Sequence, residues 1–85
     1  MTTQEIKVAG LRLFEATVVA MSNVANGCIA DSKIVEENTV RLVKMISWFR
    51  DNDLMEDLKY FVYSGKFNRS GNHFYAKALF ERITK

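Results

Sequence analysis

Residues 2–27, TTQEIKVAGLRLFEATVVAMSNVANG, decide the fold class of this 85-residue chain. Thr2 followed three residues later by Glu5 matches a capping box, in which the two side chains satisfy backbone N–H groups at the start of a helix. Asn26-Gly27 is a typical stop, because glycine readily adopts the left-handed conformation of a helix cap. Between these signals apolar residues recur every three to four positions, namely at Ile6, Leu11, Leu13, Phe14, Val18, Met21 and Val24. The stretch therefore predicts a long helix that is apolar over most of its circumference.

A second helix is expected from Asp31 or Ser32 to about Asp51. Glu37 and Arg41 have the spacing of an ion pair on its solvent side. Its buried face is expected to hold Ile34, Val35, Leu42, Val43, Ile46 and Phe49.

Two shorter helices are expected in the rest of the chain. Asp53 and Glu56 repeat the capping-box spacing and predict a third helix that ends at Ser64-Gly65. Residues 65–72 are polar and bracketed by glycines, which predicts a loop. Asn72 then caps a last helix that carries Tyr75, Ala76, Leu79, Phe80 and Ile83.

These signals predict an all-α fold, a small bundle of about four helices forming a single domain over residues 1–85. The alternative is an α fold with a C-terminal β-hairpin around residues 60–75, where Tyr60–Tyr63 and His73–Tyr75 are β-prone segments on either side of the glycines. The helical period of residues 76–83 argues against the hairpin.

Composition indicates the compartment. Apolar residues make up 48% of the chain, enough for a core, and Cys28 is the only cysteine, so no internal disulfide can form. A small domain without disulfides is typical of a reducing compartment. Residues 1–5 do not resemble a signal peptide, and the apolar stretch 13–30 is interrupted by polar residues, which argues against a membrane span. We therefore expect a cytoplasmic protein that does not bind a membrane.

The search for chemistry gives no catalytic, metal or cofactor site. Cys28 and His73 have the residue types of a nucleophile and its base, but Cys28 follows a helix C-terminus, whose negative end disfavours a thiolate. Asp51 and Asp53 begin a calcium-loop pattern that then lacks its glycine and its final glutamate. Gly65-Lys66 lacks the first glycine of a phosphate loop. Asn68-Arg69-Ser70 matches a glycosylation sequon without a secretory signal.

An enzyme would require carboxylates such as Glu36 or Asp57 to face a pocket, which the sequence does not indicate. We therefore expect a protein without enzymatic activity.

One segment stands out as a candidate partner-binding site. Nine of the ten aromatic residues lie between Trp48 and Phe80, and the expected loop in this span carries two cations, no acid and Phe67. Phe67 either packs back into the core or contacts a partner. Cations beside an aromatic ring and a helix N-terminus suit an acidic protein surface or a phosphate backbone. The candidate partner-binding residues are Lys66, Phe67, Asn68, Arg69, His73 and Lys77.

The sequence thus favours a small regulatory protein, an inhibitor or adaptor, that acts by binding another protein. The wide apolar face of residues 6–25 also suggests a homo-oligomer, for example a homodimer. The alternative is a nucleic-acid-binding module that uses residues 64–85, which hold five basic and one acidic side chain within a chain of net charge +2.

Overall fold

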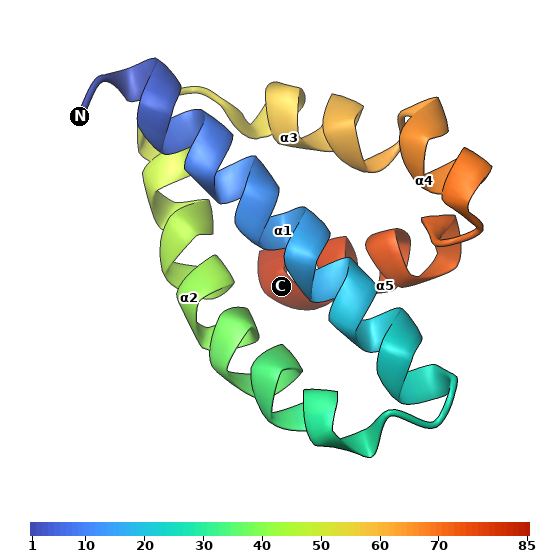
Figure 1. Cartoon of the computed structure of the whole chain (residues 1–85). Coiled ribbons are helices and arrows are strands. Elements are labelled where there is room, and N and C mark those ends of the chain that lie inside the picture. The colour runs from blue at the N-terminus through green and yellow to red at the C-terminus, as the bar shows by residue number, and fades with distance from the viewer.

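The computed structural model describes residues 1–85, and its regular structure is entirely helical (Figure 1). The all-α prediction is confirmed, and the hairpin alternative is wrong because residues 60–62 and 73–75 lie within helices. In chain order the elements are α1 (Thr3–Ala25), the 3-10 turn η1 (Ile29–Asp31), α2 (Ser32–Asp51), α3 (Met55–Val62), α4 (Gly65–Ser70) and α5 (His73–Thr84).

Both predicted ends of α1 are confirmed. The hydroxyl of Thr2 accepts the N–H of Glu5, and the carboxylate of Glu5 accepts the N–H of Thr2, each at 3.2 Å. At the other end Gly27 has a φ of 102°, and the N–H of Cys28 donates to the carbonyl of Asn23 at 2.8 Å. This closing bond is the signature of the Schellman motif, which satisfies carbonyls left free at a helix end.

α1 and α2 run antiparallel and make the most extensive helix–helix contact of the fold (Figure 1). Gly10 lies in this contact and leaves no room for a side chain, because a Cβ atom there would stand 2.6 Å from the Met45 sulfur and 2.9 Å from a ring carbon of Phe49. α5 packs against both helices and lies behind α1 in Figure 1. By length and composition alone α1 could cross a membrane, but here its side with Phe14 and Val18 is buried in the core.

α4 forms where the sequence predicts a loop, and Phe67 explains why. Its side chain is 2% exposed. Its ring packs edge-to-face against Phe14 and Phe61, with centroid separations of 6.1 and 5.4 Å. Burial of this ring fixes the backbone on either side of it, which the polar composition of the segment does not indicate. Gly71, with a φ of 77°, then ends α4.

The predicted capping box at Asp53 and Glu56 is wrong. α3 begins at Met55, preceded by Leu54, and no side chain caps its start. Asp53 instead has a φ of 57°, and the N–H of Leu54 donates to the carbonyl of Phe49 at 2.8 Å. Asp53 therefore takes the left-handed position of a Schellman motif. It terminates α2 and does not start α3.

Candidate functional site

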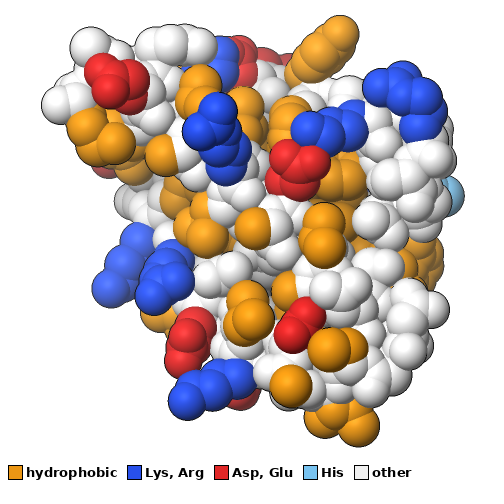
Figure 2. Space-filling view, in the orientation of Figure 1, with side chains coloured by type: hydrophobic (Ala, Val, Ile, Leu, Met, Phe, Trp, Pro, Cys, Tyr) orange, Lys and Arg blue, Asp and Glu red, His pale blue; other side chains and the backbone are white.

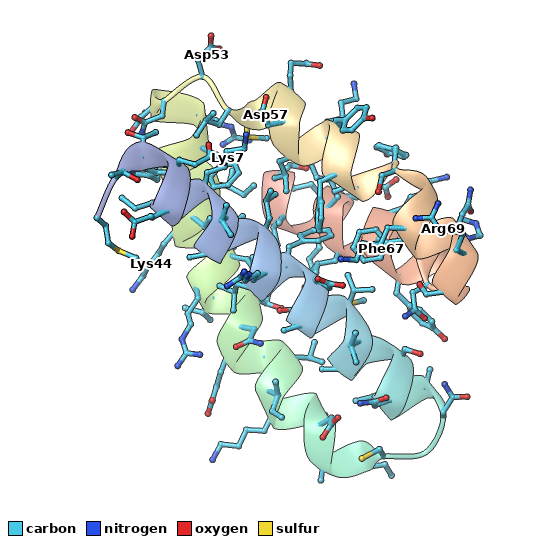
Figure 3. The ribbon with its side chains drawn as sticks, turned by 45° about the horizontal axis from the view of Figure 1, so that its top comes forward. Lys7, Lys44, Asp53, Asp57, Phe67 and Arg69 are labelled. Atoms are coloured by element: carbon cyan, nitrogen blue, oxygen red, sulfur yellow. The ribbon has the colours of Figure 1, made fainter.

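The structure separates the six residues predicted to bind a partner. Lys66 faces α1, where its ammonium lies 2.8 Å from the carboxylate of Glu15 and 5.7 Å from the centroid of the Phe61 ring. Phe67 points inward from α4 (Figure 3). The other four, Asn68 and Arg69 on α4 and His73 and Lys77 on α5, are exposed.

Phe67 takes the first of the two roles that the sequence leaves open to it. A side chain 2% exposed, packed against two other rings, is unavailable to a partner in this conformation. The prediction that Phe67 lies in an exposed loop and contacts a partner is therefore corrected. Phe67 holds α4 against α1, and its contribution to any surface is indirect.

Phe74 is an exposed aromatic residue that is not among the six candidate residues. Its side chain is 70% exposed, and with His73, Lys77, Ala78 and Glu81 it lines a shallow hollow on the outer side of α5. The helical period carries the signal that would have found it. Ala76, Leu79 and Ile83 face the core, and at 100° per residue Phe74 falls about 160° away from Ala76.

An apolar hollow adjoins Phe74. It lies where the end of α1, the start of α2 and the start of α5 meet, and five of its six lining residues are apolar. Tyr75 forms one wall, and its ring packs edge-to-face with that of Phe74 at a centroid separation of 5.9 Å. The lining residues are Met21, Val24, Ala25, Ser32, Val35 and Tyr75. Phe74 therefore adds an exposed aromatic ring next to this wall, beside His73 and Lys77.

A second groove, between α1 and α3, has a different character. Lys7 forms an ion pair with Asp57, and both side chains lie between the two helices (Figure 3). With Lys66 paired to Glu15, this groove is bridged by charged pairs over an apolar floor of Leu11 and Phe61. These contacts join α3 and α4 to α1.

The groups considered for chemistry do not converge. Asp57 is paired with Lys7, whereas Glu36 is exposed on α2. Cys28 is an exposed free thiol. No three His, Cys, Asp or Glu side chains lie close enough together to hold a metal ion, and every buried side-chain nitrogen or oxygen has a hydrogen-bond partner.

Comparison with known proteins identifies no relative. No family model, curated protein or solved structure matches the chain.

Proposed function

We propose that this chain is a protein-binding module without enzymatic activity, and that it docks an apolar segment of its partner on the apolar hollow and Phe74. One observation carries the proposal: a phenylalanine 70% exposed packs edge-to-face against Tyr75, which forms one wall of a hollow lined almost wholly by apolar side chains. Covering a side chain of this size contributes about 1.5–3 kcal/mol. Aromatic residues in such positions are typical anchors of protein interfaces.

The charges around Phe74 favour a particular kind of partner segment. His73 and Lys77 lie on the same turn and the next turn of α5, and both are exposed. An amphipathic helix that places an apolar side chain in the hollow, a carboxylate beside Lys77 and a hydrogen-bonding group beside His73 would suit this surface. Binding without chemistry suits an inhibitor or adaptor, and we place this activity in the cytoplasm.

Nucleic-acid binding by residues 64–85 is the less favoured alternative. Lys66 is paired with Glu15. Lys77 and Arg82 lie five residues apart on α5, which separates them by about 140° around the helix. A nucleic-acid site usually gathers its cations on one face, and these cations are spread around the chain.

Photocrosslinking in the native host tests the proposal. A benzoylphenylalanine replaces either Phe74 or Tyr60, which is the matched control because it is an aromatic residue 81% exposed on α3. We expect a protein adduct at position 74 and none at position 60, and the adduct should survive nuclease. Ala25→Glu should remove the adduct, since it places a charge at an exposed position in the lining of the hollow.

The proposal fails if position 74 gives no adduct or if both positions give the same adduct. It also fails if nuclease removes the adduct, or if the adduct persists in the Ala25→Glu variant.

A further inference from the structure

The outer face of α2 carries two valines that nothing in the chain covers. α2 forms one edge of the bundle (Figure 1). Val40 and Val43 are 59% and 51% exposed on this face, although the sequence predicts Val43 to be buried. Glu36 and Ser47 continue the line at spacings of four, three and four residues, the repeat along which two helices pack. We call Glu36, Val40, Val43 and Ser47 the outer stripe of α2.

Charged side chains of alternating sign follow one edge of the outer stripe. At 100° per residue they fall within about 40° of one another around the helix. Figure 3 shows Lys44, one of them, pointing away from the bundle. In order along α2 they are Lys33, Glu37, Lys44 and Asp51, which read positive, negative, positive, negative.

None of these four charges forms an ion pair within the chain. The two ion pairs of the structure join α1 to α3 and α4. The predicted pair of Glu37 with Arg41 does not form, and Arg41 instead donates to the side-chain oxygen of Asn38 at 3.2 Å. The four charges are therefore free to meet charges from outside the chain.

The geometry points to a second copy of this chain as the partner of the outer stripe, with the two α2 helices antiparallel about a two-fold axis near residues 41 and 42. An antiparallel copy presents the four charges in reverse order, so each charge meets one of opposite sign. Lys33 then faces Asp51 of the other copy, and Glu37 faces Lys44. About the same axis Val40 packs on Val43, and Glu36 lies opposite Ser47. An axis between residues 41 and 42 thus sets the valines opposite each other, and it brings Asp51 within about one residue, and Lys44 within about two residues, of the positions opposite Lys33 and Glu37.

Other arrangements of two copies fit less well. In a parallel pair in register the two-fold axis runs along the helices, so the charged edges of the two copies lie on opposite sides of the contact and the four charges do not meet. The sequence suggests self-association through residues 6–25, but the most apolar side of α1 lies in the core. What α1 leaves exposed is mostly small and polar, as at Ala9, Arg12 and Ala16, with Val19 as its one exposed large apolar side chain within residues 6–25. Figure 2 shows apolar side chains scattered among polar ones on one face of the molecule.

The expected dimer is weak and reversible. Its contact is one pair of helices with two valines from each copy at the centre, at the low end of specific interfaces. The outer stripe and its charges share no residue with the apolar hollow. The inference therefore goes beyond the proposed function, and either can fail without the other.

Sedimentation equilibrium with reductant present, from about 5 to about 500 μM, tests the dimer over the range expected for so small a contact. The unaltered chain should show a monomer–dimer equilibrium that weakens with salt. Glu37→Lys and Lys44→Glu should each weaken it about tenfold or more, because by symmetry each creates two like-charge contacts.

Combining the two substitutions distinguishes the antiparallel pairing from other contacts. An equimolar mixture of Glu37→Lys and Lys44→Glu chains should form a heterodimer, and the chain with both changes should recover homodimerisation. Glu56→Lys, an exposed charge on α3, is the control and should leave the equilibrium unchanged. A strictly monomeric chain, single variants that dimerise normally, or no recovery in the mixture would overturn the inference.

Discussion

The two long helices and the three short ones are held in the fold by different kinds of contact. α1 and α2, of 23 and 20 residues, make the most extensive helix–helix contact, in which Gly10 lies against Met45 and Phe49. α3, of eight residues, buries Leu58 and Val62, whereas α4, of six residues, buries only Phe67, and each forms one ion pair to α1. We call α1 with α2 the long-helix half, and α3 to α5 the short-helix half.

This difference follows from helix length. Helices shorter than about 12–15 residues are marginal in water on their own, because nucleation is costly. α3 and α4 therefore depend on tertiary packing, which α3 obtains from Leu58, Val62 and Phe61, and α4 from the contacts of Phe67 with Phe14 and Phe61. The long-helix half relies on many small contacts and on the close packing of α1 against α2. The two halves should consequently respond to different substitutions.

Phe67→Ala tests the short-helix half and should have the largest effect. We expect a loss of about 3–5 kcal/mol in the free energy of unfolding, since the change leaves a cavity beside two rings and removes the only buried side chain of α4. Urea unfolding followed by circular dichroism measures it. Phe74→Ala is the matched control and should change stability by less than about 0.5 kcal/mol, because that ring is largely in solvent.

Phe67→Leu keeps the test informative if the alanine variant does not fold. It preserves most of the volume and should cost about 1.5 kcal/mol. Equal losses at positions 67 and 74 would contradict the assignment of one ring to the core and the other to a binding surface.

Gly10→Val tests the long-helix half. The new side chain would overlap the buried ring of Phe49 and displace Met45, so we expect a loss of about 1–3 kcal/mol from overpacking. Ala9→Val is the control. It adds a branched side chain at the neighbouring, exposed position and should cost only about 0.5 kcal/mol of helix propensity. If both variants lose the same free energy of unfolding, close packing at Gly10 does not hold α1 against α2.

Predictability from the sequence follows the same division. The long-helix half can be predicted from local sequence signals. For α1, the capping box at Thr2, the stop at Gly27 and the apolar period all lie within or next to the helix itself. α4 does not, because it forms through the contact of Phe67 with Phe14, 53 positions away in the sequence.

The sequence predicts only the part of the candidate site that depends on local signals. His73 and Lys77 are exposed, as a polar segment suggests, whereas Phe67 was assigned to a loop that does not exist. The helical period of α5 could have identified Phe74. The apolar hollow could not have been predicted, because it forms where three helix ends meet, and packing order is not encoded in the period of any one helix.

Asp53→Gly tests the junction between the two halves. It should have the smallest effect on stability and should increase the free energy of unfolding. Asp53 ends α2 with a φ of 57°, the position that Gly27 and Gly71 occupy at the ends of α1 and α4. Its side chain points away from the bundle (Figure 3). A residue with a Cβ is strained in the left-handed region, and glycine relieves that strain at some cost in backbone entropy.

We expect the net result to be a gain of about 0.5 kcal/mol in the free energy of unfolding, measured by urea denaturation. Asn52→Gly is the control. Asn52 has a φ of −105°, and its side chain donates to the carbonyl of Trp48 at 2.9 Å, so glycine there removes a contact without relieving strain and should cost about 1 kcal/mol. Opposite signs at two adjacent residues would show that the junction is limited by backbone strain at one position. A loss at both would mean that the carboxylate of Asp53 itself stabilises the turn between the long-helix and short-helix halves.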